Sequence, residues 1–212
     1  MKMKANEIDK KRIVLEQFIG EDLEQYCERY LGIDFKLALQ GVLTEYVQYL
    51  IDSSKTFQYQ KKDRSNLEFI QELIYSRCAE LKLLEKWTDK VVLDGSDKEL
   101  IICKYATNRP DFFEVNSARH YEVISSYRGF FLSTEQMFLT KEKLKNLCYY
   151  AEKYELYVIA LDILYQRYTF VPIYSQLEQN PIIPTENGYN LLLKGLNWYS
   201  LYEPDMITQR SE

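Results

Sequence analysis

The spacing of hydrophobic residues changes after residue 87, and this change constrains the fold more than any other feature of the sequence. Up to that point, hydrophobic residues recur at the spacing of amphipathic helices, which predicts helices over 7–31, 34–51 and 66–87. Beyond it, short runs rich in β-branched and aromatic residues alternate with turn residues, a pattern typical of strands. The sequence therefore predicts a helical N-terminal part followed by a part that mixes strands and helices.

Short runs with the composition of strands continue through the second half of the chain. The expected strands cover 90–93, 99–106, 112–116, 120–127, 130–133, 156–164 and 167–173. The polar turn at 117–119 predicts that the strands on either side of it form an antiparallel hairpin. Thr140 is expected to cap a helix that ends near residue 154, and a further amphipathic helix is expected near 189–201.

The order of strand, helix and strand over 120–164 predicts a right-handed crossover between parallel strands. We therefore expect an α/β (α+β) fold in which a mixed central sheet is flanked by helices. The polar stretch 53–65 marks a boundary. The expected regions are an N-terminal helical region at 1–64, an α/β core at 65–175, and a C-terminal loop and helix at 176–212 that packs on the core.

The charge of the chain and its metal-ligating residues argue against several functions. The net charge is −5, so the chain lacks the broad basic footprint of a non-specific nucleic-acid coat, although a local basic groove is compatible with it. A single histidine and four cysteines without a CxxC pair argue against a zinc site. Phosphate-loop, dinucleotide-binding, nucleophile-elbow and HExxH motifs do not occur, which disfavours those enzyme classes.

The sequence also carries information about where the protein works. It has no signal-peptide pattern and no apolar run of the ~20 residues that span a bilayer. Its cysteines lie within apolar runs, which favours small buried thiols over a disulfide framework. These features predict a cytoplasmic protein that has no membrane partner.

Two carboxylates are the candidate for chemistry. Asp111 begins one expected strand and Glu122 lies in the next, so the hairpin between them brings the two side chains together. Such a pair can hold Mg²⁺, which binds oxygen ligands. A bound Mg²⁺ can activate water and stabilise charge on a phosphodiester. Because residues two apart in a strand share a face, Glu122 is expected on the same side as His120 and Ile124.

These residues resemble the signature of the PD-(D/E)xK superfamily, the restriction-endonuclease-like nucleases. Pro110-Asp111 resembles the PD element, and Glu122-Val123-Ile124 lies where the family has (D/E)xK. The segments 130–136 and 154–159 are similar to those that follow the active-site strand in nuclease domains of large defence proteins. The resemblance covers roughly 66–165. It implies a restriction-endonuclease-like core and metal-dependent binding or cleavage of DNA, in a defence or mobile-element setting.

One position departs from the family signature. Ile124 stands where the family has the lysine that orients or activates the attacking water. The resemblance then implies Asp111 and Glu122 as catalytic metal ligands, with Lys104 or Arg128 as the replacement cation. A Pro-Asp pair is also ordinary turn chemistry at the start of a strand.

The alternative is an interaction module without catalysis. It would be an inactive nuclease-like domain, or an unrelated α/β domain, that acts through protein partners, with the N-terminal helices as a docking region. Ile124 and the acidic net charge favour this alternative, whereas the Asp111 and Glu122 spacing favours the nuclease. The sequence leaves the oligomeric state open.

Overall fold

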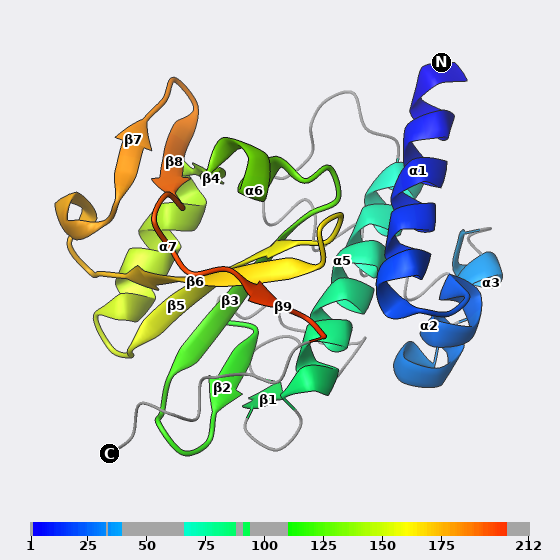
Figure 1. Ribbon diagram of the computed structural model, residues 1–212, viewed down its shortest axis with the longest axis horizontal. Helices are drawn as coiled ribbons and strands as arrows, with labels where there is room; N and C mark the ends of the chain where they lie inside the picture. Colours follow the sequence, from blue (N-terminus) through cyan, green and yellow to red (C-terminus); the bar gives the residue numbers. More distant parts are fainter. Residues whose placement is uncertain (1, 33, 40–65, 88–90, 94–109, 203–212) are drawn as a thin grey trace. The chain divides into compact units, whose positions relative to one another are not determined.

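A computed structural model describes residues 2–32, 34–39, 66–87, 91–93 and 110–202 of the chain. The element order mixes helices and strands, which confirms the predicted α/β (α+β) class (Figure 1). In this described part, no helix is both long and apolar enough to cross a membrane. Cys27, Cys78 and Cys148 are buried free thiols, as their apolar surroundings in the sequence predict.

The chain divides into two compact units, Met1–Phe112 and Phe113–Glu212. In the first unit, α1 (Lys2–Ile19), α2 (Leu23–Leu31) and α5 (Asn66–Lys86) pack together. Their buried apolar residues are Leu15, Phe18, Ile19, Leu23, Cys27, Leu31, Ile74, Cys78, Leu81 and Leu83. The predicted boundary at residue 64 would instead place α5 in the second region. This unit also contains α3 (Phe35–Leu39) and β1 (Val91–Leu93).

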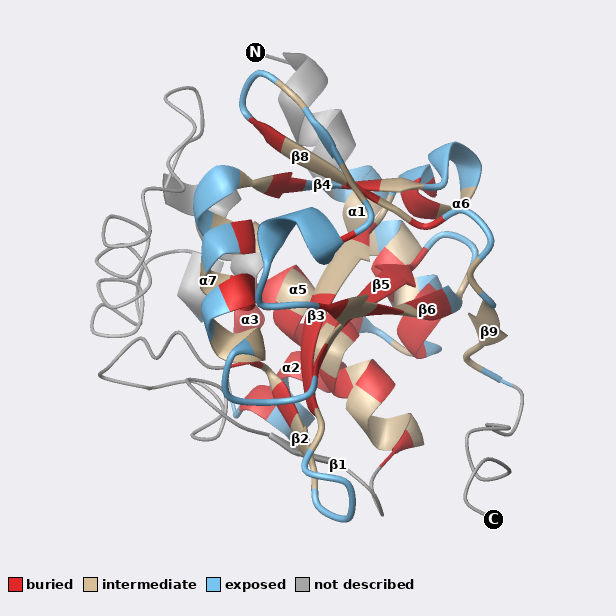
Figure 2. Cartoon of the chain, turned by 90° about the vertical axis from the view of Figure 1, so that its left-hand side faces the viewer, coloured by how far each residue is buried: buried red, intermediate tan, exposed pale blue. Residues whose placement is uncertain are grey.

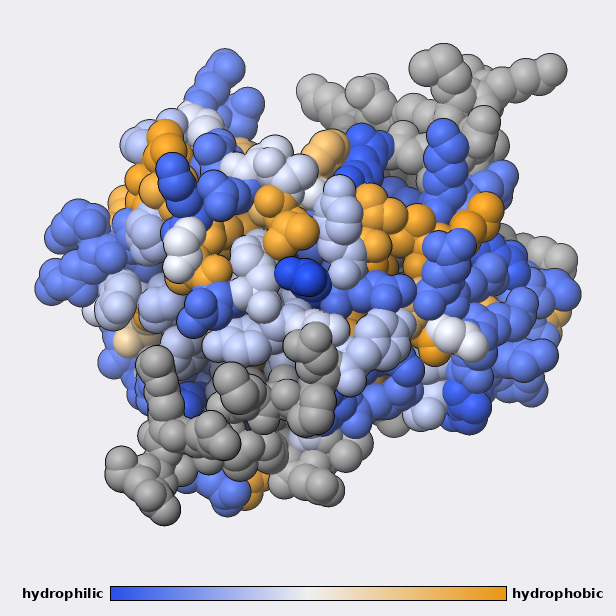
Figure 3. All heavy atoms as spheres, viewed as in Figure 1, coloured by the Kyte–Doolittle hydropathy of each residue, from blue (hydrophilic) through white to orange (hydrophobic). Residues whose placement is uncertain are grey.

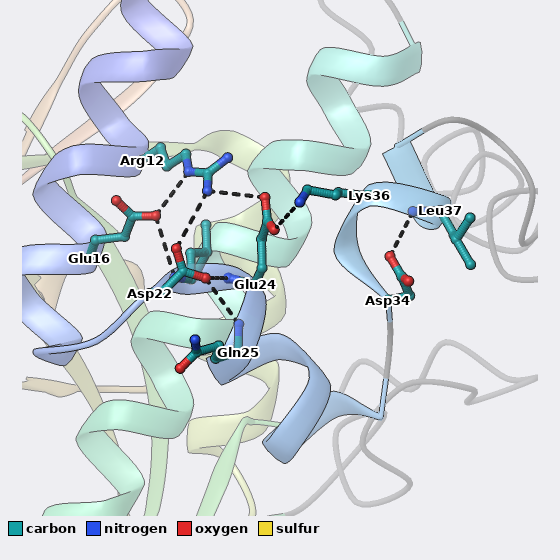
Figure 4. Close-up of polar contacts among 9 residues, drawn as sticks. Arg12, Glu16, Asp22, Glu24, Gln25, Asp34, Lys36 and Leu37 are labelled. Atoms are coloured by element: carbon teal, nitrogen blue, oxygen red, sulfur yellow. Dashed lines mark hydrogen bonds and ion pairs between the residues drawn. The ribbon is translucent and has the colours of Figure 1, made fainter.

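The helix expected over 7–31 is two helices, because a turn separates α1 from α2 (Figure 4). Gly20 takes a left-handed conformation with φ +79°, which glycine adopts without strain. Asp22 then caps α2 by accepting hydrogen bonds from the backbone N–H groups of Glu24 and Gln25. Arg12 bridges the two helices, donating to a Glu24 carboxylate oxygen at 3.2 Å.

The helix expected over 66–87 is confirmed by α5. The helix expected over 34–51 begins as α3, and the rest of that range lies outside the described residues. The strand expected over 99–106, together with Lys104, also lies outside them. The strand expected over 90–93 is confirmed as β1.

In the second unit, the main sheet contains β2 (Phe112–Glu114), β3 (His120–Ser126), β5 (Leu156–Asp162), β6 (Arg167–Ile173) and β9 (Tyr199–Ser200), in that spatial order. β2 and β3 form the predicted hairpin, whose turn is closed by a hydrogen bond from the backbone N–H of Glu114 to the carbonyl of Arg119 at 2.8 Å. β5 pairs with β6 in antiparallel register.

β3 and β5 are parallel, and α7 (Lys141–Ala151) lies between them in the sequence. The predicted helical crossover between parallel strands is therefore confirmed, and its right-handedness stays a prediction. A second, antiparallel sheet has the order β4 (Gln136–Thr140), β8 (Gly188–Leu192) and β7 (Ile182–Pro184).

Two expected elements are wrong. The strand expected over 130–133 is the short helix α6 (Phe130–Thr134), because the Asp162 carboxylate accepts a hydrogen bond from the backbone N–H of Leu132 at 3.0 Å and holds the turn. The helix expected near 189–201 is replaced by β8 and β9. Leu191 and Leu193 are both buried, so the apolar period there is two, and pairing with β4 satisfies the backbone of β8.

The main sheet has two different faces. On one face, Leu156, Val158 and Ala160 of β5 join a hydrophobic core with residues of α7, β4 and β8. On the other face lie aromatic side chains such as Tyr121, whose ring centroid is 5.8 Å from that of Phe170. Figure 2 shows that α7 is buried on its sheet side and exposed on its other side.

Candidate active site

Glu122 in β3 and Lys143 in α7 form an ion pair beside the hydrophobic core of the second unit. Lys143 Nζ donates a hydrogen bond to Glu122 Oε1. The Glu122 side chain is 11% exposed and that of Lys143 is 30% exposed, so the pair lies at the edge of the core. The contact joins the predicted metal ligand to a cation 21 residues further along the chain.

The alternation of side chains along β3 directs Glu122 to this face. Ile124, two residues on, packs against the core, so Glu122 faces α7 as well. His120 lies on the same face, and its ring centroid is 4.2 Å from that of Tyr154, just beyond the end of α7. The expected grouping of Glu122 with His120 and Ile124 is therefore confirmed.

The first turn of α7 determines the position of Lys143. Thr140 is the N-cap, as predicted, and its Oγ1 accepts a hydrogen bond from the backbone N–H of Lys143 at 3.1 Å. Leu144 and Leu147 on the same helix are buried in the core. The cap and the buried leucines together fix the rotation of the helix, and Lys143 then reaches β3.

Ile124 occupies an environment that does not suit a lysine. Its side chain is partly buried and contacts the hydrophobic core. A cation at this position would be placed against apolar side chains, which penalises the charged form. Lys143 supplies an ammonium group to the same carboxylate from a neighbouring element, and the sequence analysis did not identify this residue. The available signal was a lysine three residues after a helix-capping threonine.

The other predicted site residues have different positions. Asp111 immediately precedes β2 and is half-buried. Arg128 is exposed and lies beyond the end of β3, with its guanidinium carbon 5.9 Å from the ring centroid of Phe130. Four strand residues separate Glu122 from the end of β3, which is ~13 Å at about 3.3 Å per residue. Arg128 is therefore not the cation that contacts Glu122.

Asp111 and Glu122 lie in different compact units of the chain. Lys143 contacts one carboxylate oxygen of Glu122, Oε1. Within the described ranges, no group of three or more His, Cys, Asp and Glu side chains could hold a metal ion. Sharing of one cation by Asp111 and Glu122 stays a prediction.

A second buried carboxylate, Asp162, has a structural role. It lies at the end of β5, is fully buried, and accepts hydrogen bonds from the backbone N–H groups of Leu132 and Tyr165 at 3.0 and 3.4 Å. Burial raises the pKa of Asp162, and the backbone hydrogen bonds act in the opposite direction. Through these hydrogen bonds, the Asp162 carboxylate holds α6 and the turn after β5 in place.

No family model matches this sequence, and no curated protein is significantly similar to it.

Proposed function

We propose that this chain is a nuclease-fold protein of the PD-(D/E)xK type that cleaves DNA in a metal-dependent reaction. The observation that carries the proposal is the contact between Lys143 and Glu122. In the family signature, a lysine and an acidic residue come together on one strand. Here Glu122 stays on the strand, and a lysine from α7 brings its ammonium group to the carboxylate.

The order of elements supports the same proposal. Helix α5 precedes β1, β2 and β3, and α7 then leads to β5, which is parallel to β3. The resemblance implies such an order of helix, strands, helix and strand. Asp111 immediately precedes β2, and Glu122 lies in β3, which is the chain order of the two acidic positions that the resemblance implies.

The residues would divide the chemistry between them. Glu122 and Asp111 would hold Mg²⁺, which supplies positive charge for the phosphodiester and acidifies a bound water. Lys143 would orient the attacking water and stabilise negative charge on the phosphate, because its ammonium group offers three N–H donors. We place this activity in the cytoplasm, in a defence or mobile-element setting.

The test is cleavage of plasmid and linear DNA by purified protein with Mg²⁺ or Mn²⁺. The proposal expects cleavage by the wild type and a loss of at least about 100-fold in Glu122→Gln and in Asp111→Asn, because each variant lacks one anionic metal ligand. Glu114→Gln, a carboxylate change in β2, is the matched control. Circular dichroism confirms that each variant is folded. Cleavage that survives both substitutions would place the active site elsewhere.

A second candidate function, a protein-interaction module, is favoured by one surface. On the outer side of the second sheet, Phe138 is 50% exposed and Ile183 is 44% exposed, and both pair with Asn190 in the strand register. Hydrophobic side chains are visible in this region around β7 and β8 (Figure 3). Exposed apolar side chains that gather on one sheet face can mark a binding site for a partner. A wild type that neither binds nor cuts DNA would favour this alternative.

A further inference from the structure

A series of aromatic rings lies beside the Glu122 and Lys143 pair. Consecutive ring centroids are 5.8 Å apart from Tyr149 to Tyr150, 6.5 Å to Tyr154, 4.2 Å to His120, and 5.0 Å to Phe113. We refer to these five residues as the aromatic row. It links the end of α7 to β3 and the β2 hairpin strand.

The aromatic row is close to the candidate active site for two reasons. Tyr150 is seven residues after Lys143, so both lie on the same side of α7. His120 is two residues before Glu122, so both lie on the same face of β3. The aromatic row and the ion pair therefore both lie along the boundary between α7 and β3.

Part of the aromatic row is open to solvent. Tyr149 is 51% exposed and Tyr154 is 44% exposed, although His120, which contacts Tyr154, is buried. The Tyr149 ring contacts Tyr150 and has the Lys153 ammonium over it, and the Tyr154 ring contacts His120 and Tyr150, so neighbouring groups hold both partly exposed rings in place. Rigid, exposed aromatic faces are suited to stacking against flat ligands, because little conformational entropy is lost on binding.

The charge on this helix is opposite to that of the whole chain. Residues 141–154 contain four lysines and two glutamates, which gives 4 − 2 = +2, whereas the chain carries −5. Lys153 interacts directly with the aromatic row, since its Nζ is 2.7 Å from Tyr149 Oη and 4.3 Å from the Tyr149 ring centroid. Lys141 and Lys145 are also exposed on α7. The surface thus pairs aromatic faces with cations.

We propose that the aromatic row and Lys153 bind single-stranded DNA, with unpaired bases stacked on Tyr149 and Tyr154. Bases stack on aromatic side chains whatever their sequence, and lysines contact the phosphates between them. The inference extends the proposed function, because it makes a single-stranded segment the substrate that reaches Glu122 and Lys143. A duplex buries its base faces and cannot use the row in this way.

Binding is measured separately from cleavage by fluorescence anisotropy in EDTA, with a labelled dT20 oligonucleotide and a 20-base-pair duplex as probes. The wild type is expected to bind dT20 at least 10-fold more tightly than the duplex. Tyr149→Ala and Tyr154→Ala should each weaken dT20 binding about 10-fold, within the range of base–aromatic stacking. Lys153→Ala should weaken binding and lower its dependence on salt.

Two controls separate stacking from general surface effects. Tyr149→Phe keeps the ring and should retain dT20 affinity. Tyr174→Ala removes a comparably exposed tyrosine outside the row, 45% exposed, and should leave binding unchanged. Dissociation constants for dT20 that are the same in the wild type, Tyr149→Ala and Tyr154→Ala would overturn the inference. Tighter binding of a U20 oligonucleotide would overturn the assignment to DNA, and binding only of a proline-rich peptide would identify a protein partner instead.

The inference and the proposed function fail in different ways. Glu122→Gln should not cut DNA, and Tyr149→Ala should weaken dT20 binding by the same factor in the presence and absence of Glu122→Gln. A wild type that cuts DNA but binds duplex as well as dT20 contradicts only the single-strand inference. A wild type that binds dT20 through Tyr149 and does not cut contradicts only the nuclease proposal.

Discussion

Lys143 Nζ donates a hydrogen bond to Glu122 Oε1, joining the first turn of α7 to the middle of β3. The two residues are 21 positions apart, and the pair is mostly shielded from solvent. The hydrogen bond therefore brings a cation to the Glu122 carboxylate in a chain that has Ile124 where the family signature has a lysine.

The energetic coupling of this pair should be measurable. Lys143→Met alone leaves a mostly buried carboxylate without its cation, and we expect it to lower the free energy of unfolding by about 1–3 kcal/mol. Adding Glu122→Gln should recover part of that loss, because the unpaired charge is then removed. Urea unfolding of the wild type, both single variants and the double variant gives the coupling free energy. Additive losses would show that the two side chains do not interact in solution.

Ile124→Lys should destabilise the protein rather than restore the family signature. The new ammonium group would contact the hydrophobic core that Ile124 now contacts. We expect a loss of about 2–4 kcal/mol in the free energy of unfolding and no gain in cleavage. Ile124→Val is the control, with an expected loss of about 1 kcal/mol. A stable Ile124→Lys protein that cuts faster than the wild type would refute the assignment of the lysine role to Lys143.

Asp162 should make stability depend on pH. Burial raises its pKa in the folded protein above the ordinary value near 3.8, so the folded state binds the proton more tightly than the unfolded state does. Stability from this group is therefore highest at low pH and is lost as pH rises through the folded pKa. The difference in unfolding free energy between the wild type and Asp162→Asn should fall as pH rises from 3.5 and then level off. A difference that grows with pH would show that the pKa of Asp162 is lowered instead.

Gly188→Ala should disrupt the second sheet. A Cβ atom at Gly188 would lie 2.1 Å from the carbonyl oxygen of Leu139, a backbone atom in the neighbouring strand β4. Because neither backbone can give way cheaply, we expect a loss of at least about 2 kcal/mol in stability. Asn187→Ala, at the adjacent exposed position, is the matched control and should change the melting temperature little. Equal melting temperatures for both variants would contradict the close approach of β4 and β8.

Local patterns predicted the elements whose periodicity is unambiguous. α5, β3, α7, β5 and β6 lie where the hydrophobic spacing and the Thr140 cap predict them. β8 was mistaken for a helix because its strand character depends on pairing with β4, a contact made by residues far away in the sequence. Gly20 and Asp22 mark the break between α1 and α2. The hydrophobic spacing continues across this break, and it therefore predicted a single helix.

Of the two residues in the ion pair, only Glu122 was predicted from the sequence, because the contact of Lys143 depends on tertiary packing. Glu122 was identified because the face of a strand residue follows from its position in the alternating pattern. Lys143 was not identified because its contact with Glu122 depends on how α7 packs against the sheet, through Leu144 and Leu147. A motif read along one strand does not contain that information.

The most direct test is single-turnover cleavage of DNA with Mg²⁺ by Lys143→Ala, compared with Lys194→Ala at an exposed position outside α7 and the aromatic row. If Lys143 acts on the attacking water, its loss should reduce the rate by about 100-fold or more, and Lys143→Arg should retain part of the activity. Lys194→Ala should cut within about 3-fold of the wild type. Equal rates for wild type and a folded Lys143→Ala would contradict the central claim that the α7 lysine replaces the lysine of the signature.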